Sequence, residues 1–393
     1  MKKKILFLMP SFGYGGVEST FLSLLKIMDK NKYEITLMML NVDRDCLVRI
    51  PKDIKICTIK IPEKDEGIFF GKKKIAFKYL KKFQIIKILK FLVYSRNISL
   101  TENRTKNFEY FKKISNDIPV VEEEFDLAID YFGYATFTTF YLSEKINAKK
   151  KISWLHSIMS RFEPSAFKEF YEKMDRIYAC SEMVKEDFET IFPTINTVEV
   201  FYNIINPIEI RKKAQIKGGF IDNYDGKKIL TVARICHEKG IDIAARTYNL
   251  LRQNDYRVRW YIIGEGSAEE KNKIYEIVHD KENFIYLGFQ SNPYNYMEQC
   301  DIYVQPSRFE GYCTTTNEAR IIGCPIVMTN VSGASEQIEN GKTGYIVESD
   351  ELSLYNAITK LLDSKELIDQ FKENLKLLDC DTRNEVNKLN IFL

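Results

Sequence analysis

Short runs of apolar and β-branched residues recur along the whole chain, and each is followed by a turn and then by a segment in which apolar positions have helical spacing. Strands that read as continuous apolar runs are those covered on both faces, which is typical of parallel sheets with helices on either side. The predicted strands are residues 5–9, 35–40, 54–59, 127–131, 152–155, 177–179 and 198–201 in the first half, and 229–232, 260–263, 284–287, 302–304, 326–328 and 345–347 in the second. This pattern predicts an α/β protein with two doubly wound, Rossmann-like domains.

The boundary between these domains is expected within residues 203–226, where turn-forming residues gather without a strong apolar run. The expected domains are residues 1–205 and 206–375, and residues 376–393 are expected to return to the first domain. A chain of 393 residues fits two domains, because single cores stop growing at roughly 250–300 residues. Two such domains would face each other across a cleft between two sets of strand carboxyl ends, where open α/β sheets bind ligands.

The composition narrows the classes of function. The chain is 45% hydrophobic and 29% charged, which is a globular profile, and 58 Lys and Arg against 55 Asp and Glu leave a formal charge of +3. A bulk charge this small argues against nucleic acid as a partner. Eight cysteines without a C-x-x-C pair and only three histidines predict that the chain has no zinc site.

The first apolar run, residues 5–9, follows three lysines in the manner of a short signal peptide. Signal peptides need roughly 7–15 apolar residues in that run, so we predict a strand instead. No stretch approaches the ~18 uninterrupted apolar residues of a spanning helix. Scattered cysteines fit a reducing compartment, and we therefore expect a cytoplasmic protein.

A glycine-rich loop, residues 11–18, follows the first strand and opens a helix. Glycines let the backbone approach a ligand closely, and the helix N-terminus offers N–H groups and a positive dipole to an anion. Gly15 and Gly16 are therefore predicted to face a phosphate, and the alternative is a tight turn without a ligand. A nicotinamide or flavin site needs G-x-G-x-x-G, and Glu18 stands in place of the third glycine.

Two cations follow the first strand of the second half. Arg234 and Lys239 precede a helix predicted over residues 241–251, and an arginine, a lysine and a helix N-terminus together can hold a diphosphate. The alternative is that both cations pair with surface acids such as Glu238.

Two glutamates further along, Glu310 and Glu318, are predicted to point into one cleft. Glu310 lies in a loop after a strand, and Glu318 lies about one turn into a helix that Thr314 or Thr315 is expected to cap. Their carboxylates could accept hydrogen bonds from sugar hydroxyls while the helix end holds phosphate. Taken alone, the spacing fits two surface glutamates equally well.

Together these segments resemble the large family of retaining glycosyltransferases of GT-B fold, which includes bacterial mannosyl-, glucosyl- and N-acetylglucosaminyltransferases. The resemblance covers essentially the whole chain and is densest over residues 228–347. It is carried by Gly15-Gly16-Val17-Glu18, Trp154-Leu155-His156, Ala179-Cys180-Ser181-Glu182, Thr231-Val232-Ala233-Arg234 with Lys239-Gly240, Gly264-Glu265-Gly266, Glu310 with Glu318, and Gly341-Lys342-Thr343-Gly344-Tyr345.

The resemblance implies that the nucleotide-sugar donor lies mainly on the second domain. Glu318 matches the family's ribose-binding glutamate, and Glu310 matches the glutamate that faces the donor sugar. Arg234 and Lys239 match the pair that holds the diphosphate. His156 matches a first-domain histidine that reaches the transferred sugar.

Further donor contacts are implied for the backbone. Phe289 lies where the family contacts the base, and the segment that would contact sugar and phosphate is Gly311, Tyr312, Cys313 and Thr314. The chain departs from the family at Tyr312-Cys313, where Phe-Gly is frequent. The resemblance therefore does not identify the donor sugar. The residues alone leave two alternatives open: His156 could be a core histidine, and Asp130 could be an acceptor-side base or a helix cap.

The expected function is sugar transfer from a nucleotide diphosphate sugar, with a UDP-sugar favoured. The acceptor would be a polysaccharide or lipid-linked glycan in cell-surface polysaccharide synthesis, such as capsule. The resemblance implies retention through front-face attack. Because the two cations and a helix N-terminus could neutralise the leaving diphosphate, no metal and no cofactor are expected. The alternatives are a sugar-nucleotide epimerase and a non-catalytic nucleotide-sugar-binding subunit of a transferase complex.

A basic stretch lies in the first half of the chain. Residues 67–101 contain no acid, and nine cations between Lys72 and Arg96 alternate with apolar residues at helical spacing. A basic amphipathic helix can lie on an anionic membrane, with each cation near the surface contributing ~1 kcal/mol. Residues 71–96 are therefore expected either to attach the protein to the inner face of the cell membrane or to pack on the first domain.

Overall fold

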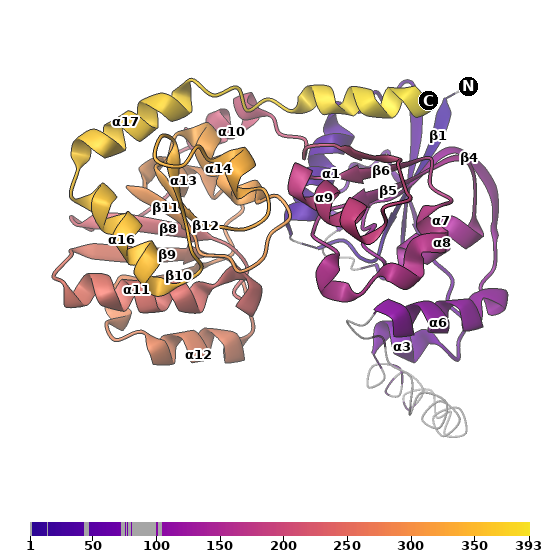
Figure 1. The fold of residues 1–393 in the computed structure, drawn as a ribbon, viewed down its shortest axis with the longest axis horizontal. Helices are drawn as coiled ribbons and strands as arrows, with labels where there is room; N and C mark the ends of the chain where they lie inside the picture. The colour runs from indigo at the N-terminus through magenta and orange to yellow at the C-terminus, as the bar shows by residue number, and fades with distance from the viewer. Residues whose placement is uncertain are drawn as a thin grey trace. The chain divides into compact units, whose positions relative to one another are not determined.

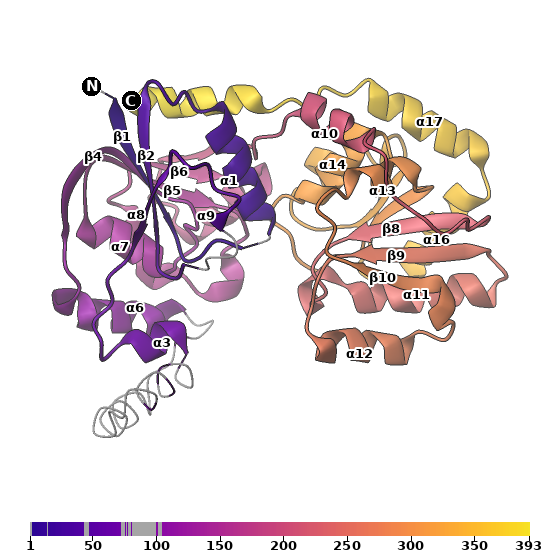
Figure 2. The same cartoon turned by 180° about the vertical axis from the view of Figure 1, so that it is seen from behind.

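The computed structural model describes residues 2–13, 15–42, 47–71, 75, 77, 80, 100 and 104–393. The chain divides into two compact units (Figure 1). Unit 1 is Met1–Tyr202 with Val386–Leu393, and unit 2 is Asn203–Glu385. Each unit is built on its own parallel sheet, as Figure 2 shows from the opposite side.

Unit 1 has a seven-stranded sheet among its described residues, in the order β3-β2-β1-β4-β5-β6-β7, with every neighbouring pair parallel. The strands are β1 (Lys3–Met9), β2 (Tyr33–Met39), β3 (Lys55–Thr58), β4 (Val121–Asp130), β5 (Ile146–Leu155), β6 (Arg176–Ala179) and β7 (Val198–Val200). The helices are α1 (Gly16–Ile27), α3 (Glu66–Phe70), α6 (Arg104–Ile114), α7 (Phe137–Lys145), α8 (Lys168–Tyr171) and α9 (Glu182–Ile191), with short 3-10 turns η1 (Ser115–Asp117), η2 (Ser160–Phe162) and η3 (Ser165–Phe167).

Unit 2 has a six-stranded parallel sheet in the order β10-β9-β8-β11-β12-β13. Its strands are β8 (Lys227–Val232), β9 (Val258–Ile263), β10 (Phe284–Gly288), β11 (Ile302–Gln305), β12 (Ile326–Thr329) and β13 (Gly344–Val347). Its helices are α10 (Pro207–Ala214), α11 (Ile241–Gln253), α12 (Ala268–Ile277), α13 (Tyr294–Gln299), α14 (Thr314–Ile322), α15 (Ala334–Gln337), α16 (Glu351–Leu362) and α17 (Lys365–Lys376), with 3-10 turns η4 (His237–Lys239) and η5 (Lys281–Asn283).

The sheet of unit 2 separates two apolar clusters. One cluster joins the strands to α11, α12, α16 and α17, with Trp260 and Tyr248 fully buried in it. The other joins the strands to α13 and α14 through Met297 and Ala319. Helices on both faces explain why the strands read as continuous apolar runs.

All thirteen predicted strands are found among the described residues, which confirms two doubly wound α/β units. The strands β4 and β5 each begin six residues earlier than predicted. The first halves of β4 and β5 carry exposed charges, and they stay in the sheet because they pair with each other, for example Glu124 with Asn147. Continuous burial begins only at Leu127 in β4 and at Ile152 in β5, where the predicted strands begin.

The units divide between Tyr202 and Asn203, close to the expected boundary, but the returning segment is shorter than the expected 376–393. Residues 376–385 belong to unit 2. Cys380 is buried there against Ile205, and Thr382 Oγ1 accepts from Ile205 N at 2.8 Å and donates to the Asn203 carbonyl at 2.7 Å. These contacts keep the segment on unit 2, and the 3-10 helix η6 (Arg383–Phe392) then leads into unit 1, where Lys388 O accepts from Tyr178 OH at 2.9 Å.

Most of the basic stretch 71–96 lies outside the described residues, which include only Gly71, Ile75, Phe77 and Leu80 from it. Its expected contact with an anionic membrane therefore stays a prediction. In the described part of the chain, no helix is long and apolar enough to cross a membrane.

Candidate functional site

The loops after β8, β9 and β11 meet at the carboxyl edge of the sheet of unit 2, and two glycines allow this close approach. A Cβ on Gly264, where φ is +145°, would lie 1.9 Å from the carbonyl oxygen of Ala233. A Cβ on Gly240, where φ is +63°, would lie 1.9 Å from the carbonyl oxygen of Pro306. Both positions thus require glycine for its missing side chain and for its backbone conformation.

Lys239 and Glu310 form an ion pair at this edge. Lys239 Nζ lies 2.7 Å from both Glu310 Oε1 and Glu310 Oε2, and the exposed fractions of the two side chains are 20% and 8%. Burial alone would lower the pKa of Lys239, but the charge and hydrogen bonds of Glu310 outweigh it, so the pKa is raised. The lysine therefore stays charged, and its alternative partner Glu238 is not the acid it binds.

The N-terminus of α14 follows Glu310 in the chain and has no side-chain cap. The N-cap residue is Cys313, so the expected cap by Thr314 or Thr315 is wrong. The Thr315 hydroxyl instead donates to Gln305 Oε1 at 3.3 Å. The first amides of this helix are therefore left to donate hydrogen bonds to an anion.

Side chains in α15 and just before it hold the loop that precedes α14. Ser332 Oγ donates to the Gly311 carbonyl at 3.1 Å, and Gln337 Nε2 donates to the Cys313 carbonyl at 2.7 Å. Tyr312 is half-buried, and burial raises its pKa to about 12. These contacts hold the backbone that was predicted to touch sugar and phosphate.

Glu318 lies on the same helix, and 7% of it is exposed. Its Oε1 accepts a hydrogen bond from Tyr294 OH of α13 at 2.9 Å. Burial raises the pKa of Glu318 to about 7, although Tyr294 and Lys213 act in the opposite direction. The carboxylate is thus held in a place where ionisation is costly, as functional acids often are.

Arg234 follows β8 and Phe289 follows β10, the two strands that flank β9 in the sheet. Arg234 is exposed, and its side chain makes no hydrogen bond or ion pair to another described residue. The Phe289 amide, in contrast, donates to Glu265 Oε1 at 3.0 Å. Within the described ranges, no cluster of three or more His, Cys, Asp or Glu side chains is placed to hold a metal ion.

The structure shows a second ion pair at this edge, which was not predicted from the sequence. Arg308 donates to both carboxylate oxygens of Asp242 at 2.7 Å, and its main-chain amide donates to the Glu238 carbonyl at 2.8 Å. Burial alone would raise the pKa of Asp242, but hydrogen bonds from Arg308 and Arg246 lower it to about 2. This pair fastens the loop that carries Glu310 to the first turn of α11.

In unit 1 the glycine loop is held by side chains of its own unit. Glu18 Oε1 accepts from the Gly13 amide at 3.3 Å, and Arg49 Nη1 donates to the Gly13 carbonyl at 2.7 Å. A Cβ on Gly15 would lie 2.4 Å from Glu18 Oε2. Glu18, which displaces the third glycine of a dinucleotide loop, thus folds back on the loop, and the phosphate contact of Gly15 and Gly16 stays a prediction.

His156 follows β5 in a group of aromatic rings. Its ring is parallel to Trp154, with 5.9 Å between centroids, and lies 4.7 Å from Tyr131. Only 9% of it is exposed, which matches the core-histidine alternative, and its contact with a sugar stays a prediction. Asp130 is fully buried and accepts from Thr139 Oγ1 of α7 at 2.7 Å, so it anchors a helix; burial raises its pKa to about 6.

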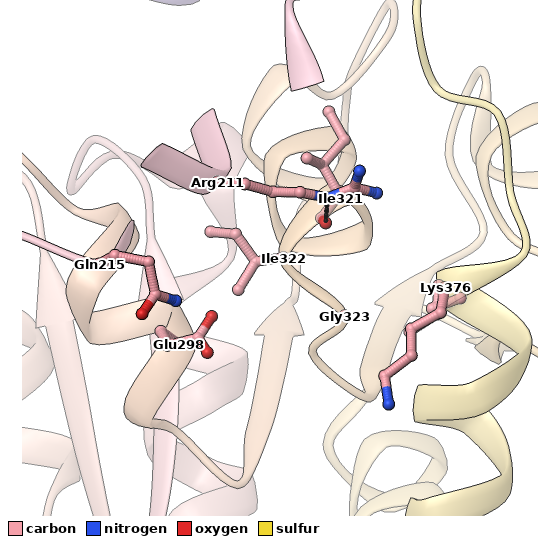
Figure 3. Close-up of a pocket in the computed structure, with 8 residues that line it drawn as sticks. Arg211, Gln215, Glu298, Ile321, Ile322, Gly323 and Lys376 are labelled. Carbon is pink, nitrogen blue, oxygen red and sulfur yellow. Dashed lines mark hydrogen bonds between the residues drawn. The ribbon is translucent and has the colours of Figure 1, made fainter. Parts of the chain in front are cut away.

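A separate cavity of about 390 Å³ lies at the carboxyl end of α14 (Figure 3). Arg211 Nε donates there to the Ile321 carbonyl at 3.1 Å and so satisfies the end of the helix. Its lining residues are Arg211, Gln215, Glu298, Ile321, Ile322, Gly323, Leu375 and Lys376. None of these is a predicted donor-binding residue.

Comparisons with known proteins concern mainly unit 2. Residues 213–377 match the family model described as glycosyl transferases group 1. The capsular polysaccharide biosynthesis glycosyltransferase CapM of Staphylococcus aureus is 27% identical over 203 residues, which are 49% of this chain and 51% of that protein. An N-acetylgalactosaminyltransferase of Campylobacter jejuni that acts on a diphospho-undecaprenol glycan is 29% identical over 52% of this chain and 56% of its own length. The chain thus spans about half the length of these curated relatives.

Solved structures extend the likeness of fold to both units. HepE of Anabaena, solved with UDP and glucose, matches with a TM-score of 0.69 and 16% identity, over 99% of this chain and 98% of its own. TarM of Staphylococcus aureus, solved with UDP, matches with a TM-score of 0.68 and 15% identity over 99% of both chains. Unit 2 thus carries the match to the glycosyl transferases group 1 model, and the two parallel-sheet units share the GT-B fold of these solved structures.

Proposed function

We propose that the chain transfers a hexosyl or N-acetylhexosaminyl group from a UDP-sugar to a polysaccharide or lipid-linked glycan acceptor, with retention of configuration and without a metal ion. One observation carries the proposal. The Lys239–Glu310 pair stands beside the uncapped N-terminus of α14, and the same helix carries the buried Glu318. Unit 2 thus offers Glu310 to the sugar, Lys239 and the helix N-terminus to the diphosphate, and Glu318 to the ribose.

In this proposal, different groups of unit 2 bind different parts of the donor. Lys239, the exposed Arg234 and the first amides of α14 neutralise the diphosphate, which is the leaving group. Glu310 accepts hydrogen bonds from sugar hydroxyls, and Glu318 accepts them from the ribose. Fixed charges in a partly buried site need no reorganisation during the reaction, which is why they stabilise developing charge well.

The chemical step follows from the retained configuration. The bond between the sugar C1 and the diphosphate oxygen breaks, and the acceptor oxygen forms its bond to C1 on the same face. The proton of the acceptor hydroxyl passes to the departing diphosphate, so the step balances without a further reagent.

The proposed donor and acceptor are inferred from proteins to which this chain is similar. HepE and TarM are solved with UDP, CapM is named for capsular polysaccharide biosynthesis, and the Campylobacter jejuni enzyme is named for a diphospho-undecaprenol glycan. A cytoplasmic protein that attaches to the membrane through residues 71–96 would meet a lipid-linked acceptor. Binding to vesicles containing anionic lipid at low salt supports this attachment, and absence of binding removes it.

The function is tested with a panel of UDP-, GDP- and ADP-sugars, with and without EDTA, by measuring released nucleotide. We expect release from a UDP-sugar at the same rate in EDTA, and NMR of the product should show the donor's anomeric configuration. Tight donor binding without release would favour the non-catalytic subunit. Loss of release in EDTA or an inverted product would refute the corresponding part of the proposal.

A further inference from the structure

A chain of buried hydrogen bonds runs from β11 to Glu310. Tyr303 OH donates to Gln305 Oε1 at 2.7 Å, and Gln305 Nε2 donates to Ser307 Oγ at 2.8 Å. Ser307 Oγ donates in turn to Glu310 Oε1 at 2.7 Å. Tyr303, Gln305 and Ser307 are at most 1% exposed, so water does not replace these partners.

The direction of these hydrogen bonds is fixed at the Glu310 end. A carboxylate paired with Lys239 can only accept hydrogen bonds, so the Ser307 hydroxyl must donate its one hydrogen bond to Glu310. Ser307 Oγ then has to accept from Gln305, which turns the amide nitrogen of Gln305 toward Ser307 and its oxygen toward Tyr303. An isosteric acid at residue 305 could not take the place of this amide.

Gln305 also joins two parts of the site. Its Oε1 accepts from the Thr315 hydroxyl in the first turn of α14 at 3.3 Å, while its Nε2 lies 3.4 Å from Glu310 Oε1. The amide therefore ties the helix end that faces phosphate to the carboxylate that faces the sugar.

The two oxygens of Glu310 are used unequally. Oε1 accepts from Ser307, Lys239 and Gln305. Among the residues that the structure describes, Oε2 accepts from Lys239 alone. A carboxylate oxygen has two lone pairs, so Oε2 keeps one for a hydroxyl group of a ligand.

We propose that Gln305 is a positioning residue that holds Glu310 with Oε2 directed to the donor sugar. The proposal rests on the proposed function, in which Glu310 meets that sugar. Gln305 touches no substrate and acts only through Ser307, Thr315 and Glu310. Its loss should weaken recognition of the sugar more than recognition of the nucleotide, because Glu318, Lys239 and Arg234 make no hydrogen bond to Gln305.

The test compares equilibrium binding of UDP with that of UDP-glucose and UDP-N-acetylglucosamine, so that it needs no acceptor. The variants are Gln305→Leu and Gln305→Glu. The control is Thr247→Val, which removes the buried hydroxyl that donates to the Ile243 carbonyl on α11 at 2.9 Å, away from Glu310. Urea unfolding of each variant shows whether stability alone has changed.

Both Gln305 variants should bind the preferred UDP-sugar on the order of tenfold more weakly and bind UDP within twofold of the wild type. Thr247→Val should leave both constants within twofold. The proposal is overturned if a Gln305 variant binds the UDP-sugar as the wild type does, or if its UDP and UDP-sugar affinities fall together. A wild type that binds UDP but no UDP-sugar better than UDP contradicts the sugar contact of Glu310, and one that binds no nucleotide contradicts the proposed function.

Discussion

Burial makes ionisation of Glu318 costly for stability, whereas its proposed function needs the ionised carboxylate. This opposition can be tested directly. Its carboxyl is 7% exposed, and its pKa is raised by burial from an ordinary value of 4.5 to about 7. The folded protein therefore holds the proton more tightly than the unfolded chain does. Stability that is present below pH 4.5 is lost as the pH rises through 7, since the unfolded chain ionises first.

The size of this loss follows from the two pKa values. Between 4.5 and about 7, each pH unit is worth about 1.4 kcal/mol, so the ionised Glu318 costs about 3 kcal/mol at pH 8. Glu318→Gln removes the charge and keeps an oxygen that can accept from Tyr294. The variant should be more stable than the wild type by up to about 3 kcal/mol at pH 8, and the difference should vanish near pH 4.5.

The assay is urea unfolding between pH 4.5 and 8.5, followed by fluorescence. The chain has two tryptophans, Trp154 in unit 1 and Trp260 in unit 2, so a Trp154→Phe background makes the signal report unit 2. Glu282→Gln, an exposed glutamate of the same unit, is the control and should change stability by less than about 0.5 kcal/mol. A Glu318→Gln variant no more stable than the wild type at pH 8 would refute this account of the carboxyl.

Four further outcomes are expected. Affinity for UDP should fall as the pH drops through about 7, because ribose hydroxyls donate to the ionised Glu318; an affinity that is flat between pH 6 and 8 would contradict the ribose role. Arg234→Ala and Lys239→Ala should each lower turnover on the order of 10²–10³-fold, and turnover within threefold of the wild type would contradict the diphosphate role. Of the two, only Lys239→Ala should also cost about 3 kcal/mol of stability in a melting experiment, because it leaves Glu310 buried without its cation. Gly264→Ala should prevent normal folding, whereas Gly323→Ala, whose Cβ meets nothing within 4 Å, should cost only about 1–2 kcal/mol for its positive φ; similar melting temperatures for both would contradict the packing at Gly264.

The fold could be predicted because a parallel sheet covered on both faces leaves a continuous apolar signal. That signal fails where a strand is solvated. At the start of β4, Glu123 is held by Lys4 at 2.8 Å and Lys55 at 3.2 Å, and these partners are 119 and 68 residues away in the chain. Nothing in local hydropathy marks such a segment as a strand, and so β4 and β5 were predicted too short.

The sequence could predict which charged residues gather at the candidate site, but not which of them bond to each other. Lys239 and Glu310 were found because charged residues after buried strands gather at one edge of a sheet, but their pairing spans 71 residues. Gln305 reads as an ordinary polar end of a strand, and only the folded structure shows its amide between Thr315 and Glu310. The three threonines after Cys313 favoured a threonine cap, whereas the loop geometry places the cysteine at that position.

In the proposed function, the groups around Glu310 take part in cleaving the nucleotide-sugar. The most direct measurement is the initial rate of UDP release from the preferred UDP-sugar by the wild type, Glu310→Gln and Thr247→Val under identical conditions. We expect the wild type and Thr247→Val to release UDP at similar rates and Glu310→Gln to be slower on the order of 10²-fold or more. Release of no nucleotide from any donor, or an equal rate for Glu310→Gln, would contradict the claim.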